Sequence, residues 1–159
     1  MIRSYGNFIN GKFDLEGSRH DLRSPADGSV IASITMGSRE KTLEAMLQAL
    51  RIGGRIFLSF PCEQSVEFPK RGGTLNYYDD QTHKFSPPDF AKITGKFEQL
   101  GFQLDHAVKN YSPKIYWIIG LIQEPISKFR NKVMRGTWPY YGFESIIIAT
   151  KTKSTRSSS

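Results

Sequence analysis

Cysteine and long apolar runs are the two features that the sequence most clearly lacks. The chain holds one cysteine, Cys62, which excludes an internal disulfide framework and a zinc site built from several cysteines. Its most apolar run, residues 115–122, is far shorter than the roughly 20 residues of a membrane-spanning helix. Residues 1–15 contain no apolar run of signal-peptide length. We therefore expect a cytoplasmic protein.

Positive charge is in surplus, but it is spread unevenly. The net charge is +7 with an isoelectric point near 9.6, and residues 151–159 hold three basic residues and no acid. The remaining chain is only mildly basic, so composition does not indicate a specific nucleic-acid partner. With 159 residues, of which 38% are hydrophobic and 13% aromatic, the chain is large enough for one domain with an aromatic-rich core.

Residues 5–35 have the pattern of short β-strands joined by turns. Asn10 and Gly11 follow an apolar-rich segment, and Asn-Gly is a favoured pair for a type I′ hairpin turn. Residues 25–28 (PADG) form a second turn signal, because proline fixes φ and glycine accepts a left-handed conformation. Residues 30–34 (VIASI) then have the composition of a strand.

From Ser38 onward, helical and strand patterns alternate, which predicts an α/β fold. The spacing of leucine and methionine predicts a helix over 39–52, capped by Ser38 and ended by Gly53. A mostly apolar run at 55–60 follows without alternation, as in a strand that is buried on both faces. Further helices are predicted at 87–100 and 113–123, and further strands at 102–109 and 143–150.

Two prolines mark the expected ends of the later helices. Ser86 is the expected cap of the helix over 87–100, with Pro87 at its first position. Pro125 is expected to break or kink the helix that begins near residue 113. Residues 126–141 are then expected to be irregular and basic.

Four short motifs give the chain beyond residue 42 a resemblance to a known family. The motifs are residues 50–56 (LRIGGRI), 79–83 (DDQTH), 100–102 (LGF) and 141–147 (YGFESII). In this order and spacing they resemble the C-terminal half of a class I S-adenosylmethionine-dependent methyltransferase. The resemblance implies a Rossmann-like sheet whose last strand is inserted antiparallel between its neighbours. It also implies S-adenosylmethionine as the methyl donor.

Residues 5–42 are similar to a second family. Residues 7–13 (NFINGKF) and 24–32 (SPADGSVIA) resemble the N-terminal strands of aldehyde dehydrogenases. The catalytic residues of that family lie far downstream, and Cys62 does not match its nucleophile motif. The resemblance therefore allows, as an alternative function, an aldehyde dehydrogenase fragment without catalytic residues. The resulting domain prediction has three parts: a β-rich segment at 1–37, a methyltransferase-like half-domain at 38–151 and a disordered tail at 152–159.

The half of a methyltransferase that binds the methyl donor is not recognisable in the sequence. Such a site needs a glycine-rich turn after the first strand and an acidic residue that holds the ribose hydroxyls. Residues 1–50 contain no such strand–turn–helix arrangement. The sequence therefore predicts an incomplete sheet and a truncated or fused remnant, with S-adenosylmethionine implied by resemblance but its binding not expected. An incomplete sheet leaves an open edge, so we expect self-association.

The long segment at 61–85 holds the candidate catalytic residues. In the methyltransferase resemblance this segment faces the acceptor, which is a small molecule, a saccharide or a lipid. His83 would take a proton from an acceptor hydroxyl, with Asp79 or Asp80 orienting the imidazole. The alternative is that both aspartates are turn residues and His83 packs locally. No metal is predicted, because nothing fixes the other two histidines beside this cluster.

Residues 113–135 allow two interpretations. The run KIYWII at 114–119 is followed by several basic residues, and aromatic, apolar and basic side chains together suit an anionic membrane surface. This interpretation predicts peripheral membrane contact and, as an alternative function, a non-enzymatic interaction or membrane-surface module. The other interpretation is a helix packed on the sheet and a solvated basic loop.

Cys62 is expected to be a small buried or loop thiol. Glu63 and Glu67 are close to it in sequence, and their negative charges would raise its pKa. A raised pKa argues against a role as a nucleophile.

Overall fold

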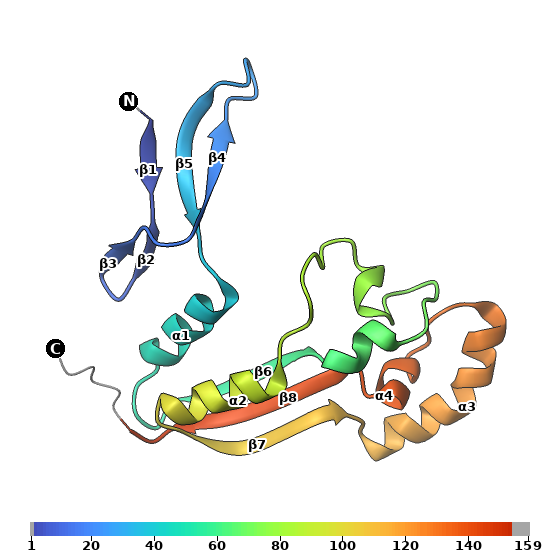
Figure 1. The fold of residues 1–159 in the computed structure, drawn as a ribbon. Helices are drawn as coiled ribbons and strands as arrows, with labels where there is room; N and C mark the ends of the chain where they lie inside the picture. Colours follow the sequence, from blue (N-terminus) through green and yellow to red (C-terminus); the bar gives the residue numbers. More distant parts are fainter. Residues whose placement is uncertain (1, 154–159) are drawn as a thin grey trace. The chain divides into compact units, whose positions relative to one another are not determined.

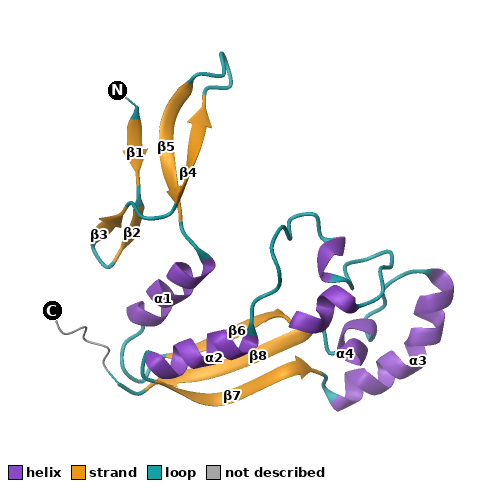
Figure 2. Cartoon of the chain, in the orientation of Figure 1, coloured by secondary structure: helices purple, strands orange, loops and turns teal. Residues whose placement is uncertain are grey.

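A computed structural model describes residues 2–153. The chain forms two compact units, and the boundary between them lies between Arg51 and Ile52. The first unit combines two small sheets with one helix and the second combines one sheet with several helices, so the predicted mixed α/β class is confirmed (Figures 1 and 2). The division falls after the first helix, whereas the sequence analysis placed it before that helix. The disordered tail predicted for 152–159 lies, apart from its first two residues, outside the described residues.

The first unit is built from a three-stranded sheet and a separate hairpin. β5 (Val30–Met36) is central, with β1 (Arg3–Tyr5) parallel on one side and β4 (Ser18–Arg23) antiparallel on the other. β2 (Asn7–Ile9) and β3 (Lys12–Asp14) pair antiparallel. The predicted type I′ turn joins them, with φ of 50° at Asn10 and 79° at Gly11. Sequence analysis did not anticipate the parallel pairing of β1 with β5.

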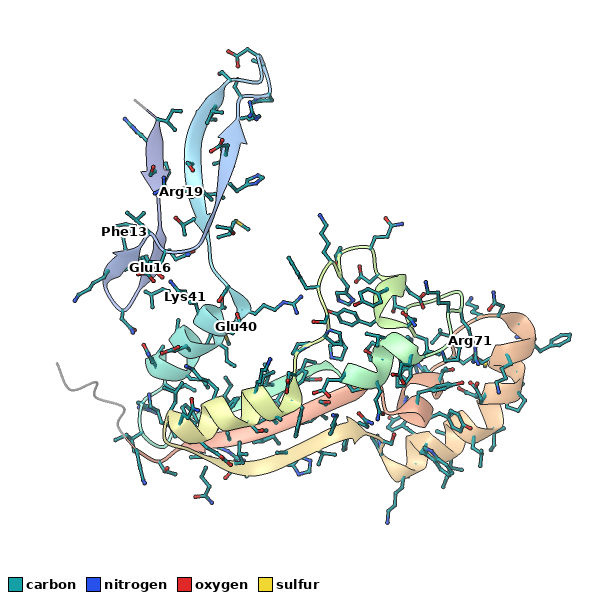
Figure 3. The ribbon with its side chains drawn as sticks, in the orientation of Figure 1. Phe13, Glu16, Arg19, Glu40, Lys41 and Arg71 are labelled. Atoms are coloured by element: carbon teal, nitrogen blue, oxygen red, sulfur yellow. The ribbon has the colours of Figure 1, made fainter. Side chains whose placement is uncertain are left out.

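Helix α1 (Arg39–Ala49) begins where the sequence predicts, because the Ser38 side chain accepts a hydrogen bond from the Lys41 amide. Lys41 also connects α1 to the hairpin through its ammonium group. It lies 2.9 Å from the Asp14 carboxylate and 3.1 Å from that of Glu16, and Figure 3 shows Lys41 directed toward Glu16. The amino group and its carboxylates therefore fix the start of the helix against the hairpin.

The second unit is built on a sheet of three strands in the order β6-β8-β7. β6 (Arg55–Pro61) and β7 (Phe102–Tyr111) each pair antiparallel with β8 (Glu144–Lys151). The two outer strands therefore run in the same direction, and the predicted antiparallel insertion of the last strand is confirmed (Figure 1). The prediction that β6 is buried on both faces is wrong, because Phe57 is 63% exposed.

Helix α2 (Phe90–Gln99) covers one face of this sheet (Figure 2). Its buried Phe97 contacts the Phe102 ring edge-on, with ring centroids 5.5 Å apart. The helix begins later than predicted, because Asp89 rather than Ser86 caps it by accepting a hydrogen bond from the Lys92 amide. The Asp89 carboxylate is directly before the first turn and can accept a hydrogen bond from its amides, so the helix begins after Asp89 rather than after Ser86.

Helix α3 (Lys114–Arg130) corrects the prediction that Pro125 ends the helix. Proline removes one backbone hydrogen bond, but its fixed φ is helical, so the helix continues to a left-handed cap at Asn131. Helix α4 (Thr137–Tyr141) lies within the segment predicted to be irregular. The two helices approach closely at Gly120 and Gly136, where an added Cβ on Gly120 would lie 2.2 Å from the Gly136 carbonyl oxygen.

Candidate functional site

The carboxyl ends of β6 and β7 lie at the same end of their sheet. The strand register places both Pro61 and Tyr111 opposite Glu144, the first residue of β8. The two longest connections of the second unit, residues 62–89 and 112–143, leave the sheet from this end (Figure 1). In open α/β sheets, ligands bind outside the carboxyl ends of the strands.

A groove of about 340 Å³ lies at this end of the sheet. Aromatic rings dominate its lining, together with one cation and one carboxylate; the lining residues are Thr74, Tyr111, Pro113, Tyr116, Arg135, Trp138, Pro139, Phe143 and Glu144. The Trp138 indole donates a hydrogen bond to the Thr74 carbonyl at 3.1 Å, which joins the two long connections at the rim. The lining suits a partly aromatic or apolar ligand that carries a polar group.

Sequence reasoning did not identify this groove. Its residues come from four separate segments that meet only when β7 and β8 pair. The one available signal was the length of the two connections, because long connections at a sheet end often hold functional residues.

The predicted cluster at 79–83 is partly assembled. The His83 Nε2 atom lies 4.0 Å from an Asp80 carboxylate oxygen, so these two side chains are brought together. Asp79 is directed elsewhere, since its carboxylate accepts a hydrogen bond from the Asn76 amide in the capping box of the 3₁₀ helix η2 (Tyr77–Asp79). His83 also stacks on the Tyr77 ring, with centroids 4.1 Å apart.

His83 has one ring nitrogen that is free for proton transfer. Its Nδ1 atom lies 2.7 Å from the Tyr77 carbonyl oxygen, and a carbonyl can only accept, so Nδ1 carries a proton. The neutral ring then has its lone pair on Nε2, the nitrogen near Asp80. Hydrogen bonds from the Thr82 side chain and amide lower the pKa of Asp80. Nε2 is therefore the ring nitrogen whose lone pair could accept a proton.

A buried ion pair that sequence reasoning missed connects the two long connections. Arg71 donates two hydrogen bonds to the Glu124 carboxylate, at 2.8 and 2.6 Å, and both side chains are 5% exposed. Arg71 also donates to Ser127 and Tyr141, and Figure 3 shows it among the side chains beside α3. The pair joins residues 53 positions apart, so no local pattern predicts it.

The pKa values of Arg71, Glu124 and Tyr141 are all shifted by burial and by the contacts among these three side chains. Burial opposes ionisation of Glu124, but the hydrogen bonds from Arg71 and Tyr141 outweigh it and hold the pKa of Glu124 below its ordinary value. The hydrogen bond to Glu124 raises the pKa of Arg71. Burial and the Glu124 carboxylate raise the pKa of Tyr141. The cluster is therefore charged and fixed at neutral pH.

Cys62 is fully buried and is not activated. Its pKa is raised, as predicted, but the cause is burial rather than the neighbouring glutamates. Glu63 forms an ion pair with Lys109 at 2.6 Å, and the positive charge of Lys109 acts on the thiol in the opposite direction.

Residues 2–153 contain neither a cluster of metal ligands nor a membrane-spanning helix. No three histidine, cysteine, aspartate or glutamate side chains in this range converge to hold a metal ion. No helix in the same range has the length and apolar character needed to cross a bilayer.

The groove does not fit the adenosyl part of a methyl donor. Such a ligand needs glycines where the backbone approaches it closely, and none of the groove's lining residues is glycine. In the first unit, β5 passes into α1 through Gly37 and Ser38, with only one glycine. In the part of the chain that the structure describes, we therefore assign no residue to S-adenosylmethionine.

The chain was compared with protein-family models, with curated proteins and with solved structures. None of the three comparisons gives a match.

Proposed function

We propose that residues 52–153 are the acceptor-side half of an S-adenosylmethionine-dependent methyltransferase, without the half that binds the methyl donor. The observation that carries the proposal is the strand order β6-β8-β7, with β8 antiparallel to two strands of like direction. The late strands of the class I methyltransferase sheet have this arrangement. Three of the motifs, at 50–56, 100–102 and 141–147, each link the end of a helix to the start of the next strand, and 79–83 lies in the connection before α2.

The two edges of the sheet support an incomplete structure. β7 has the features of a protected edge, because its pairing with β8 shifts register twice and its exposed residues are mostly polar. β6 lacks the first feature, since it pairs with β8 in continuous register, and its exposed residues Arg55, Phe57 and Ser59 include one large apolar side chain. An apolar, regular strand is typical of a position inside a sheet, so the proposed parent sheet continues beyond β6.

The acceptor side of the proposed enzyme consists of the aromatic groove and the His83–Asp80 pair. Both belong to connections that leave the carboxyl end of the sheet. In the proposal, His83 Nε2 removes a proton from an acceptor hydroxyl and Asp80 stabilises the imidazolium that forms. The acceptor class, a small molecule, a saccharide or a lipid, follows from the resemblance and from the partly apolar lining of the groove.

Calorimetric titration with S-adenosylhomocysteine tests the proposal. We expect no measurable binding, while an intact class I methyltransferase titrated in parallel binds the same ligand. Micromolar binding to this chain would contradict the proposed lack of a donor half. A folded sample, verified by circular dichroism, is required for either result to count.

A further inference from the structure

Helix α3 has its polar side buried and its apolar side exposed. It buries Gly120, Glu124 and Ser127, which follow one another at the i, i+4, i+7 spacing of a single helix face. The opposite face holds large apolar side chains that are all exposed, up to 92% at Phe129; they are Ile115, Ile118, Leu121, Ile122, Ile126 and Phe129. We call these six residues the apolar face of α3.

The orientation of α3 is fixed by polar contacts. Glu124 receives two hydrogen bonds from Arg71, and the Ser127 hydroxyl donates to the Lys132 carbonyl. Gly120 allows the close approach of α4. Because these contacts are all on the buried side, the helix cannot turn its apolar face inward without breaking a buried ion pair.

Positive charge accompanies the apolar face. Lys128 and Arg130 lie in the last turn of α3, and Lys132 and Arg135 follow it. Residues 125–143 contain no acidic residue. Tyr116 and Trp117 in the first turn lie beside this face rather than on it, since Trp117 stacks on Tyr140 of α4 and Tyr116 lines the groove, so the aromatic member of the face is Phe129. Apolar, aromatic and basic side chains in this combination favour the boundary between lipid headgroups and acyl chains.

From these observations we propose that α3 binds the surface of an anionic lipid bilayer, lying in the plane of the headgroups with its apolar face toward the acyl chains. A helix of 17 residues is about 25 Å long, which suits an in-plane position. The inference does not depend on the proposed methyltransferase origin, because it uses only α3 and its flanking charges.

Two other occupants of this face are less favourable. A second copy of the chain would place the basic residues of both copies against each other, and like charges in contact disfavour association. Strands that continue the sheet would add beyond β6, whereas α3 follows β7, the strand at the other edge (Figure 1). An anionic bilayer satisfies both the apolar and the charged requirement.

Vesicle sedimentation of the full chain tests this inference. We expect the protein to pellet with vesicles of phosphatidylcholine and phosphatidylserine, to stay in solution with phosphatidylcholine alone, and to dissociate as salt is raised. Phe129→Asp should weaken binding at least about tenfold, because a large apolar group no longer enters the bilayer. Phe13→Asp is the matched control: Phe13 is also exposed, lies in the first unit, and its replacement should leave binding unchanged.

A second pair of variants separates local charge from net charge. Arg130→Glu with Lys132→Glu should weaken binding more than about tenfold, whereas Lys12→Glu with Arg19→Glu makes the same change in net charge on the first unit and should have little effect.

Several outcomes would overturn the inference. Equal recovery in the supernatant with both kinds of vesicle excludes the bilayer as partner. Equal losses in the α3 variants and their controls would mean that binding is not local to α3. If Phe129→Asp removes self-association but leaves vesicle binding unchanged, the face is a contact between copies. Ile122→Asp, at another exposed position, replaces Phe129→Asp if that variant does not fold.

Discussion

Arg71 and Glu124 connect segments that are far apart in the sequence, and their ion pair is almost completely shielded from water. Removing one member of a buried pair leaves the other charge without a partner, which costs far more than the net stabilisation that the intact pair provides. Replacing both members with apolar groups removes that cost. If the ion pair matters, the single substitution should therefore destabilise the protein more than the double substitution; if only packing matters, both should destabilise it equally.

Glu124→Gln should lower the free energy of unfolding by about 3–5 kcal/mol, because Arg71 then remains charged and buried without a counter-ion. The double variant Arg71→Met with Glu124→Leu should recover most of this loss. Urea denaturation followed by circular dichroism measures both. Equal losses in the single and the double variant would contradict the role assigned to the ion pair.

Stability should also depend on pH through Glu124. Its pKa is below the ordinary 4.5 in the folded chain, so the unfolded state binds its proton first as the pH falls. The stabilising contribution is complete above about pH 4.5 and is lost as the pH falls through the folded pKa. Urea denaturation at several pH values should show a steeper loss for the wild type than for the double Arg71→Met, Glu124→Leu variant, in which the other carboxylates remain.

Residues that act through their near neighbours were predictable from sequence, and those that act across the fold were not. Ser38 caps α1 and Asn10-Gly11 forms its turn through atoms a few positions away. The groove and the Arg71–Glu124 pair each join residues from separate connections that are far apart in the sequence. The segment at 79–83 was predicted only in part. The loop was predicted, but the capping box that engages the Asp79 carboxylate was not.

Among the helices, α3 and α4 are in contact at two glycines, and this contact sets their separation. A methyl group on Gly120 would collide with the backbone of Gly136, and backbone cannot move aside as a flexible side chain can. Gly95, inside α2, has open space around the position of its missing Cβ. The same substitution should therefore have opposite effects in the two helices.

Gly120→Ala should destabilise the protein by about 1–3 kcal/mol, as overpacking does in a closely packed interior. Gly95→Ala should stabilise it by roughly 0.5–1 kcal/mol, because alanine restricts the unfolded chain and favours the helix. Thermal and urea denaturation of both variants test this difference in sign. A stabilising Gly120→Ala would mean that α3 and α4 are not in close contact.

The start of α2 and the end of α3 both differ from the positions that nearby prolines predict. Pro125 lies inside α3 rather than at its end. An internal proline costs about 3 kcal/mol through a lost hydrogen bond and a ring clash, and the buried contacts of Glu124 and Ser127 on either side of it hold the helix in place. For α2, the cap at Asp89 competes with the Ser86-Pro87 signal and determines the first residue. Element types were therefore predicted better than their boundaries.

At the scale of the whole molecule, the two sheet edges of the second unit differ. β7 carries two register shifts, whereas β6 pairs in continuous register and exposes the large apolar side chain of Phe57. The strand order was anticipated from the family resemblance, whereas the exposure of Phe57 was not, because an apolar run does not reveal how many strands lie beside it.

An unprotected edge favours pairing with another chain, so the wild type should elute from size exclusion as a dimer or larger species. Phe57→Lys places a charge on the edge strand and should shift the protein toward monomer. Gln103→Lys, on the protected strand β7, is the control and should leave the elution unchanged. Light scattering gives the masses, and a wild-type monomer at high concentration would count against the incomplete-sheet proposal.

The single thiol of Cys62 is enclosed where β6 ends, and its amide donates a hydrogen bond to the Phe143 carbonyl just before β8. A colourless disulfide reagent added to native protein can therefore react only during the brief moments when this junction opens. With a stability of several kcal/mol, the labelling rate should be on the order of a thousandfold slower in native buffer than in urea. The labelling rate, measured from a single absorbance trace, would therefore report how often the end of β6 separates from the start of β8.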